Sequence, residues 1–553
     1  MPKKHKISSK LKIAIYSVVA VLATLMLVAI YALGPLKTFL PNICNLTGTI
    51  FGSRTYLILF QNNYEIRPTG GFISAYGVLT INHGIPGIQF YDVYGEVDEH
   101  EYIDPPHYPM QELLGGPTYG GYTFRDTNYY VDFRDSAQEM LDFYHITQPE
   151  SEIDGIVAID FTMLESLVGL YGPVKAGDFE LTENNLFETL SAEVSDINRH
   201  DAEEIYGRKD IMKDVAKDII KNAILSPFKY RGFSALIAKN LDEKHVILWF
   251  ADEGLESKAI RLGWSGTMPE DYEDLLAVSE ANLGGMKNDR YMARNIKYEV
   301  DIQEDQIVCN LEVTMDHFGG ENIPLSGDYK GYLRAYIPSE ATQITDKTEE
   351  SKGNYKSLGE IIYLSKTEEK TVEFEYTLPI SIIEDGTYSL DLVKQPGTEA
   401  DNYEIIIHTP QGSTLESESF TTHEEHAYLS TGLSTDQRFE LTIIPDETEP
   451  RIHSHEIVEL NKIWIGFNEP LDCDTASDPF AYAITDTNTA ASETDTVYID
   501  TITCSGRDVW LDTIGMTSQN EEFYEIILRN IRDKAGNYID PNPRTITVVQ
   551  RGL

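Results

Sequence analysis

The sequence predicts an α+β multidomain protein, in which an N-terminal transmembrane helix precedes an α/β layered domain and then two β-sandwich domains. Three observations support this prediction. An uncharged apolar run follows a basic N-terminus, apolar strand patterns then alternate with amphipathic helix patterns, and short alternating strands fill the rest of the 553 residues. Strands interleaved with helices are typical of layered α/β domains, whereas many short strands separated by turns are typical of sandwiches.

The N-terminus has the features of a membrane anchor. The first twelve residues carry five lysines and no acidic residue, and an apolar run without charges follows at residues 13–33. A run of this length can cross a bilayer, whereas a cleavable signal peptide has a shorter apolar core and a small-residue cleavage site after it. The alternative, a buried core helix, rarely follows a basic tail at an N-terminus. By the positive-inside rule we expect a single-pass cell-membrane protein with a cytoplasmic N-terminus and an extracellular ectodomain.

The chain is strongly acidic and poor in cysteine. It carries 44 Lys and Arg residues against 90 Asp and Glu residues, a formal net charge of -46. A field of this sign repels nucleic acid and anionic lipid headgroups, so we exclude nucleic acid as a partner. Solubility at a surface or in a salty medium explains the acidic excess most simply, and calcium binding is the alternative. Of the four cysteines, Cys473 and Cys504 lie in one C-terminal segment and could form a disulfide in an oxidising compartment.

Hydrophobic periodicity places the elements of the α/β domain. Strands are predicted at residues 56–60, 72–81, 88–93, 155–160 and 245–250. Helices are predicted at 135–144, 162–170 and 208–223, where apolar residues recur at helical spacing. Because strands and helices alternate along this part of the chain, we expect helices packed in layers against a sheet.

Strand patterns alone continue from about residue 295 to the C-terminus. Alternating runs at 297–302, 307–314, 332–337, 371–378 and 388–393 predict one sandwich, and runs at 462–467, 497–503, 509–511, 524–528 and 544–549 predict another after a turn-rich acidic segment. The predicted organisation is therefore a cytoplasmic tail (1–12), the anchor (13–34), a linker (35–54), the α/β domain (55–290), a β-sandwich domain (291–445) and a second sandwich domain (446–553).

One long stretch resembles a known family. The segment YLILFQNNYEIRPTGGFISAYG, residues 56–77, closely resembles the signature of the bacterial domain-of-unknown-function family 4012 (DUF4012). The resemblance continues through FRDTN at 124–128, IDGIVAID at 153–160 and YGRK at 206–209, and it ends with QPG at 395–397. It therefore covers roughly residues 55–397, but the family name implies no activity.

Parts of the same stretch are distantly similar to the LytR-CpsA-Psr family, whose enzymes transfer glycopolymers from an undecaprenyl pyrophosphate carrier onto the cell wall. The strand at 154–160, the helix after it and the GPV at 172–174 are similar to one element of that family, and Arg208-Lys209 resembles its arginine helix start. The family's Pro-Arg-Asp signature is absent, with FYDV at 90–93 near its place, and its paired arginines are not evident. The resemblance thus implies a LytR-CpsA-Psr-like α/β fold more firmly than an activity.

The C-terminal segment is similar to the bacterial Ig-like modules of surface-layer proteins. IWIGFNEPL at 463–471 resembles their opening strand and acidic turn, and IRDKAGN at 531–537 resembles their closing turn. The resemblance implies that the last domain is Ig-like.

Polar residues gather where the first predicted strand ends, just before a Gly-Gly pair. Glycines that allow close backbone approach, beside arginines and carboxylates, suit the binding of an oxyanion with its metal, and transfer of a phosphate-linked group needs both. The predicted catalytic residues are Arg67, Asp92, Arg125 and Arg208; the predicted ligand-binding residues are Asn62, Asn63, Thr69, Gly70, Gly71, Asn128 and Lys209; and the predicted Mg²⁺ ligands are Glu65 and Asp126. We expect Arg67, Arg125 and Arg208 to line one cleft.

A structural interpretation of the same residues stays open. Arg67 and Glu65 can form an internal salt bridge, the asparagines can cap a turn, and residues 125–128 can be a helix-capping turn. Two functional classes follow. As an enzyme, the chain would bind a polyprenyl-pyrophosphate-linked glycopolymer or transfer it to the cell wall. As a non-enzyme, it would be a surface adhesion or envelope scaffold protein.

Overall fold

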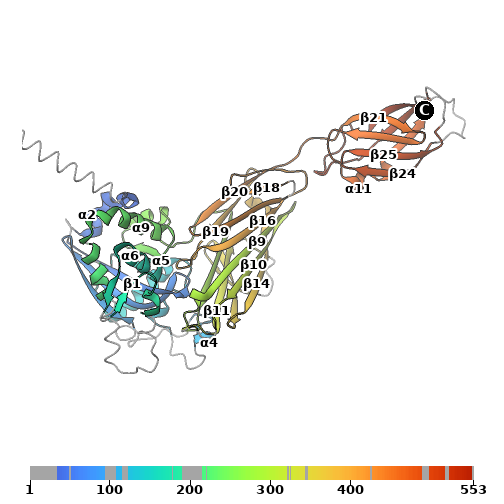
Figure 1. Ribbon diagram of the computed structural model, residues 1–553. Helices are drawn as coiled ribbons and strands as arrows, with labels where there is room; N and C mark the ends of the chain where they lie inside the picture. The colour runs from blue at the N-terminus through green and yellow to red at the C-terminus, as the bar shows by residue number, and fades with distance from the viewer. Residues whose placement is uncertain are drawn as a thin grey trace, which may run out of the picture.

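The computed structural model describes residues 34–48, 52–93, 107–114, 122–176, 179–189, 214–219, 221–223, 225–320, 323, 325–342, 347–423, 426–487, 497–516 and 522–550. The described chain is α+β, and Figure 1 shows a helix-containing part followed by two parts built of strands. Apart from its last residue, the predicted membrane span at 13–34 lies outside the described residues. Among the helices that are described, none is both long and apolar enough to cross a membrane.

The α/β domain is built on a mixed sheet with the strand order β3-β2-β1-β4-β7. β1 pairs antiparallel with β2 and parallel with β4. The strands are β1 (Ser53–Arg67), β2 (Gly70–Asn82), β3 (Ile85–Asp92), β4 (Gly155–Ile159) and β7 (Val246–Phe250). Residues 56–59 of β1 are buried on both faces of the sheet, which explains why this segment is continuously apolar rather than alternating. The five strands predicted for this domain are confirmed, with extended ends for β1 and β2.

Helices cover both faces of this sheet. Leu57 and Leu59 of β1 pack with Ala137 and Met140 of α5 (Phe133–Thr147) on one face. Ile58 packs on the other face, in a cluster with residues of α10 (Glu253–Arg261). That second face also carries α6 (Phe161–Tyr171) and α9 (Tyr230–Asp242). The predicted layering is therefore confirmed.

The predicted helices have clear start signals where they are described. The Asp132 side chain accepts a hydrogen bond from the backbone of Arg134 and caps α5, and Asp160 caps α6 through Met163. Of the helix predicted at 208–223, residues 214–219 and 221–223 are helical. Arg208 and Lys209 lie outside the described residues. The remaining short elements here are η1 (Gly34–Asn42), α2 (Ile43–Thr47), α4 (Met110–Leu114), η3 (Phe124–Asp126), β5 (Val174–Ala176), β6 (Phe179–Leu181) and η4 (Pro227–Lys229).

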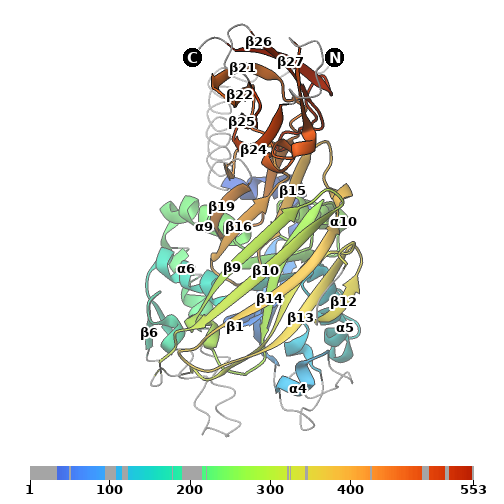
Figure 2. The same ribbon diagram turned by 90° about the vertical axis from the view of Figure 1, so that its right-hand side faces the viewer.

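The central domain is a sandwich of two sheets. One sheet has the order β14-β10-β9-β16-β19-β18 and forms the layer farther from the α/β domain (Figure 2). Its strands are β9 (Met292–Ile302), β10 (Gln306–His317), β14 (Glu369–Pro379), β16 (Asp401–His408), β18 (Thr421–Thr422) and β19 (His426–Leu433). The other sheet, β12-β13-β11-β8-β15-β20-β17, consists of β8 (Asp274–Asn282), β11 (Tyr329–Pro338), β12 (Thr348–Lys352), β13 (Tyr355–Leu364), β15 (Thr387–Val393), β17 (Thr414–Glu416) and β20 (Gln437–Ile444).

β8 joins the two larger domains. It precedes the sequence-based boundary at residue 290, yet it pairs antiparallel with β11 and parallel with β15 inside the sandwich. Leu276 and Val278 enter the sandwich core, whereas Leu275 and Ala277 contact Val131 and Met268 on the α/β side. Every residue of β8 is buried, because each of its faces is covered by a different domain. The sandwich therefore begins earlier than the sequence pattern indicates.

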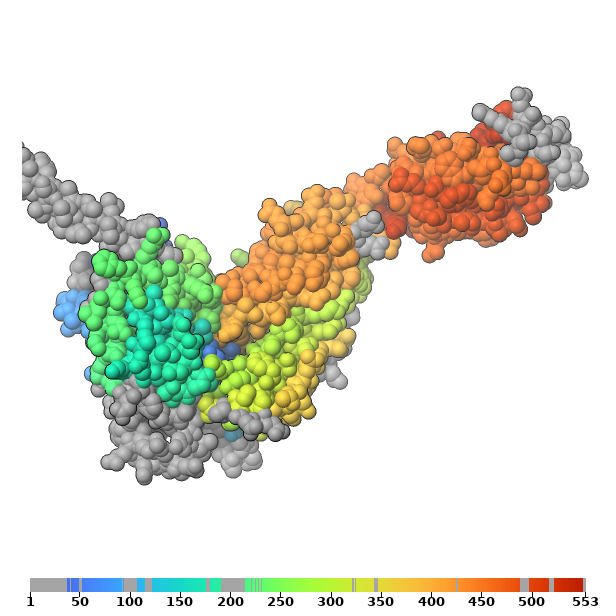
Figure 3. Space-filling view, viewed as in Figure 1, coloured from blue at the N-terminus to red at the C-terminus, as the bar shows by residue number. Residues whose placement is uncertain are grey.

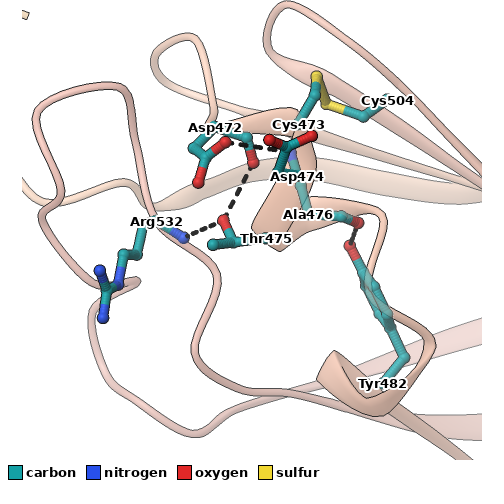
Figure 4. The surroundings of a disulfide bond; sticks show 8 residues. All are labelled: Asp472, Cys473, Asp474, Thr475, Ala476, Tyr482, Cys504 and Arg532. Atoms are coloured by element: carbon teal, nitrogen blue, oxygen red, sulfur yellow. Dashed lines mark hydrogen bonds between the residues drawn. A yellow bond between two sulfur atoms is a disulfide. The ribbon is translucent and has the colours of Figure 1, made fainter. Parts of the chain in front are cut away.

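The C-terminal domain is a smaller sandwich at the far end of the molecule (Figure 1). Its sheets have the orders β21-β22-β25-β24 and β23-β26-β27, formed by β21 (Ile452–Glu459), β22 (Lys462–Phe467), β23 (Tyr482–Asp486), β24 (Tyr498–Ser505), β25 (Asp508–Ile514), β26 (Glu522–Leu528) and β27 (Arg544–Gln550). The disulfide that the sequence left open is present: Cys473, in α11 (Cys473–Ala476), is bonded to Cys504 of β24 (Figure 4). The disulfide thus links a helical turn to an edge strand.

Candidate functional site at the junction of the two larger domains

The predicted polar cluster lies at the end of the β1–β2 hairpin, where the α/β domain meets the sandwich. The pairing of β1 with β2 shifts register between Asn62 and Ile66, so that β1 bulges over residues 63–65. Gly71 is required there, because a Cβ on it would lie 2.3 Å from the carbonyl carbon of Asn62. Gly70 has a φ of +121°, which side-chain-bearing residues rarely adopt. The Gly-Gly pair therefore shapes this bulged hairpin.

Arg67 is buried at the junction and bonds to the protein itself. Its Nη1 donates to the backbone carbonyls of Ile66, at 3.1 Å, and of Asn282, at the end of β8. Its Nη2 lies 3.5 Å from Glu65 Oε1, and only 1% of its side chain is exposed. The internal salt bridge that the sequence left open is therefore present. Arg67 also ties the α/β sheet to the first strand of the sandwich.

The last motif of the DUF4012 resemblance, QPG at 395–397, meets the first one here. Gln395 Nε2 donates to the carbonyls of Arg67, at 3.0 Å, and of Glu280, at 2.8 Å. Asn63 Nδ2 donates to the Gly397 carbonyl at 3.0 Å. A Cβ on Gly397 would lie 2.5 Å from the carbonyl oxygen of Gly70, so the two backbones touch. Segments more than three hundred residues apart thus form one buried junction.

Acidic groups of this junction are withdrawn from solvent. Asp289, in η5 (Asn288–Tyr291), accepts hydrogen bonds from the Ile66 backbone at 3.0 Å, from Asn282 Nδ2 at 2.7 Å and from Arg294 at 2.8 Å. Burial raises its pKa, and burial likewise raises the pKa of Glu65 against the opposing charge of Arg67. Buried carboxylates that are paired in this way hold a network together. Removing one partner leaves a buried charge unpaired and destabilises the fold.

The other predicted site residues join the hairpin only in part. Asn62 Oδ1 accepts from the Tyr64 backbone at 3.2 Å, and Asn128 Nδ2 donates to the Gly71 carbonyl at 2.5 Å. Asp126 accepts from Thr123 Oγ1 at 3.2 Å and is close enough to Glu65 to raise its pKa. Arg125, in η3, is partly exposed.

Of the predicted residues, Asn128 therefore contacts Gly71, and Asp126 lies close enough to Glu65 to act on it electrostatically. Asp92 ends β3, where its backbone pairs with Ala75. The predicted convergence of three arginines stays a prediction, because Arg208 falls outside the described residues.

Three residues beside this junction were not identified from the sequence. Tyr64 donates to Glu165 at 3.2 Å, and the Arg290 guanidinium lies over the Tyr64 ring at 5.0 Å and over the Phe187 ring at 4.6 Å. Burial raises the pKa of Glu165 to about 7. Tyr64 lies within the signature, but Glu165 and Arg290 belong to separate elements without any local pattern.

Figure 3 shows a notch between the two larger domains, with the blue N-terminal strands at its base.

A possible cation site lies elsewhere. Among the described residues, one group of three metal-ligand side chains has its ligand atoms within 4.8 Å of one another: Asp446, Glu469 and Asp533, between the two sandwiches. Asp533 also accepts from the Asn537 backbone at 2.8 Å. Carboxylates in this number can bind a hard cation such as Ca²⁺.

Comparisons with known proteins support part of the resemblance. Residues 52–194 match the family described as "Protein of unknown function (DUF4012)", so the resemblance is confirmed over these residues. No curated protein matches the chain.

Three solved structures illustrate what the fold is similar to. Lin1025 of Listeria innocua is 11% identical with a TM-score of 0.24, over 39% of this chain and 80% of that one. TagV of B. subtilis is 14% identical with a TM-score of 0.22, over 39% and 81%. The N-terminal part of the bacterial S-layer protein SbsC is 18% identical with a TM-score of 0.17, over 19% and 24%. The chain thus spans about a quarter of that S-layer fragment.

Proposed function

We propose that this chain is a membrane-anchored cell-envelope protein that serves as a scaffold on the outer face of the membrane. The N-terminal span holds it, the α/β domain and the central sandwich act as one unit, and the Ig-like domain extends from that unit. The observation that carries the proposal is the contact between Arg67 and Asn282, because it joins the two domains through an almost fully buried side chain.

The partners of the signature residues support a joining role. Arg67, Asn63 and Gly70 all contact the sandwich, through Asn282, Gly397 and their neighbours. A site for a polymer needs side chains open to a cleft, whereas the side chains of Arg67 and Asn63 donate to backbone carbonyls of the sandwich. The polar groups of the signature thus form hydrogen bonds between the two domains of the chain itself.

The C-terminal domain fits the same proposal. It lies at the end of the molecule remote from the α/β domain (Figure 2), and it contains the disulfide between Cys473 and Cys504. Disulfides persist in oxidising compartments outside the cytoplasm, which agrees with the orientation predicted from the N-terminal lysines. An Ig-like module in this position would space the unit from other envelope components.

Calorimetry of the full chain in lipid nanodiscs tests the proposal. The α/β domain and the central sandwich should unfold in one transition, because breaking their junction exposes buried charges of both. Gln395→Leu removes the hydrogen bonds to Arg67 and Glu280 without altering any predicted ligand-binding residue, and it should split that transition. Separate unfolding of the two domains in the wild type would contradict the proposal.

A second measurement, in cells, separates the scaffold from an enzyme. If the chain is a scaffold, Gln395→Leu and Arg67→Ala should weaken the envelope to a similar degree, because both loosen the junction. If the chain is an enzyme, Arg67→Ala should abolish its effect whereas Gln395→Leu should leave most of it. Resistance of the cells to osmotic shock is the readout.

A second candidate function is the binding, or the transfer to the cell wall, of a polyprenyl-pyrophosphate-linked glycopolymer with the help of Mg²⁺. One specific observation favours it: Arg67 Nε, Thr69 Oγ1 and Asn128 Oδ1 are buried without a hydrogen-bond partner in the part of the chain that the structure describes. Unmet buried polar atoms are costly, and a ligand or water can satisfy them.

Thermal shift tests this second candidate directly. Polyprenyl pyrophosphate with Mg²⁺ should raise the melting temperature of the full chain by mass action, and Arg125→Ala should remove that ligand-dependent increase. The scaffold predicts no ligand-dependent increase.

A further inference from the structure

The residues that follow the predicted membrane span are fixed to the α/β domain. Lys258 Nζ donates to the Thr38 carbonyl at 3.0 Å and to Asn42 Oδ1 at 2.6 Å, and the Phe39 ring stacks on Trp264 at 5.9 Å. Tyr56 OH donates to the Leu46 carbonyl at 2.8 Å. The segment predicted as a linker, from residue 38 onward, is therefore a docked stem rather than a loose tether.

A docked stem fixes which face of the domain lies next to the membrane. The predicted span ends at residue 34, and Phe39 is already packed beside Leu236 and Ile237 of α9. Five residues of a 3₁₀ helix extend only about 10 Å. The surface formed by η1, α2 and α9 (Figure 1) must then lie about that far from the end of the span.

This surface carries exposed apolar side chains. Phe228, in η4 directly before α9, is 100% exposed, Leu225 is 71% exposed, and Ile43 of the stem is 47% exposed. Phe228 comes directly before α9, whose Leu236 packs against the same cluster as Phe39 of the stem. Exposure of apolar side chains to water is unfavourable, whereas their insertion into a lipid interface is favourable.

The charge of the same segment is opposite to that of the chain. Residues 217–239 contain five basic residues, namely Lys217, Lys221, Lys229, Arg231 and Lys239, and one acidic residue, Asp218, whereas the whole chain has 44 basic and 90 acidic residues. Three of these lysines are exposed, and each forms an ion pair with an acidic neighbour, Asp214, Asp218 or Glu243. Lysines and arginines beside exposed Phe and Leu are the composition of surfaces that bind anionic bilayers. The rest of the chain is repelled by such a bilayer, so this segment can orient the domain on it.

We propose that Leu225, Phe228 and the basic residues around them dock onto the anionic lipid surface in which the N-terminal span is embedded. This inference rests on the proposed anchoring. The apolar side chains enter the interface while the basic side chains meet lipid phosphates. A lipid surface is favoured over a protein partner because the stem places this face beside the membrane without any further binding partner. The ectodomain is thereby held in one orientation on the membrane.

Tryptophan fluorescence in vesicles of the full-length protein tests the docking. Phe228→Trp places a reporter on the surface, and Phe480→Trp is the matched control because Phe480 is 86% exposed on the remote Ig-like domain. Each variant is inserted into vesicles of zwitterionic lipid or of zwitterionic lipid with anionic lipid, with and without brominated acyl chains. The difference between each variant and the wild type gives the emission of the added tryptophan.

Docking predicts that brominated lipid quenches the Phe228→Trp emission at least twofold in anionic vesicles and leaves the Phe480→Trp emission unchanged. Adding Lys221→Gln and Arg231→Gln should reduce the quenching to the level of zwitterionic vesicles. If brominated lipid quenches both reporters equally in a chain that co-floats with the vesicles, the docking is overturned while the anchor stays intact. Failure of the chain to co-float would contradict the anchor itself. Protection from iodide without quenching by lipid would show a protein, such as a second copy, on this surface and would also overturn the inference.

Discussion

Arg67, at the end of β1, donates a hydrogen bond to the backbone carbonyl of Asn282, at the end of β8, across a sequence separation of 215 residues. β1 is the central strand of the α/β sheet, and β8 is a strand of the sandwich that contacts it. The carbonyl of Arg67 in turn accepts from Gln395, so both ends of this residue are tied to the sandwich. The two domains consequently share one buried polar layer in addition to their apolar contacts.

Replacing Arg67 by Met should destabilise the joined domains by about 3 kcal/mol, the usual cost of removing one member of a buried ion pair. The loss is limited because Glu65, whose pKa burial already raises, can take up a proton. Urea unfolding followed by circular dichroism measures the change. Arg134→Met is the control, since this arginine forms ion pairs with Asp132 and Glu270 but is 37% exposed, and it should cost much less.

The sequence predicts local elements well because their periodicity is local. The strand at 56–60 and the helices at 135–144 and 162–170 follow from apolar patterns alone. The structure extends the helices by one to three residues at each end and the strand to Ser53–Arg67. β8 has no such signal, because it is buried on both faces by two domains and therefore shows no alternation. Its membership of the sandwich is decided by β11 and β15, which lie far along the chain.

The sequence predicted which polar residues gather at the candidate site but not what surrounds them in the structure. Density of polar residues before Gly70 and Gly71 correctly marked a special backbone, since one glycine has a positive φ and the other contacts Asn62. Whether Arg67 faces a cleft or a second domain depends on Asn282 and Gln395, which no local pattern connects to it. The salt bridge between Arg67 and Glu65 was the alternative interpretation, because polar residues are common in turns, and it is present.

The core of the central sandwich contains a carboxyl group that should make stability depend on pH. Burial raises the pKa of Asp274 to about 6, against hydrogen bonds from Tyr388 and Tyr298. Because the folded pKa is above the unfolded one of about 3.9, stability from this group is present at pH 3–4 and is lost as the pH rises through 6.

Between pH 4 and 6.5 the titration of Asp274 should lower the free energy of unfolding of the wild type by about 3 kcal/mol at most. Asp274→Asn should therefore remove part of the accompanying decrease in melting temperature. Melting curves of wild type and variant across this range measure it. Parallel pH profiles of the two proteins would show that Asp274 does not titrate in this way.

The disulfide should stabilise the C-terminal sandwich domain selectively. It closes a loop with a sequence separation of 31 between Cys473 and Cys504, and removing it by Cys473→Ala with Cys504→Ala should cost about 3 kcal/mol. Calorimetry should show the transition of this domain moving to lower temperature while the transition of the joined domains stays in place. Cys44→Ala, outside the disulfide, is the control. A shift of both transitions would indicate that the C-terminal sandwich domain shares its stability with the central sandwich.

Two glycine substitutions can show how closely the domains touch. Gly397 has a φ of +84°, and a Cβ on it would lie 2.5 Å from the Gly70 carbonyl oxygen, whereas Gly353 has a φ of +62° and nothing within 4 Å of its Cβ position. Gly353→Ala should therefore cost only the strain of its backbone, about 1 kcal/mol. Gly397→Ala carries the same strain and also forces the hairpin away from the sandwich, for a total of about 3 kcal/mol. Calorimetry should show Gly397→Ala separating the transitions of the α/β domain and the sandwich, while Gly353→Ala lowers a single shared transition. Equal effects of the two substitutions would mean that the domains can move apart at Gly70 without loss, and the buried junction would then contribute little to holding them together.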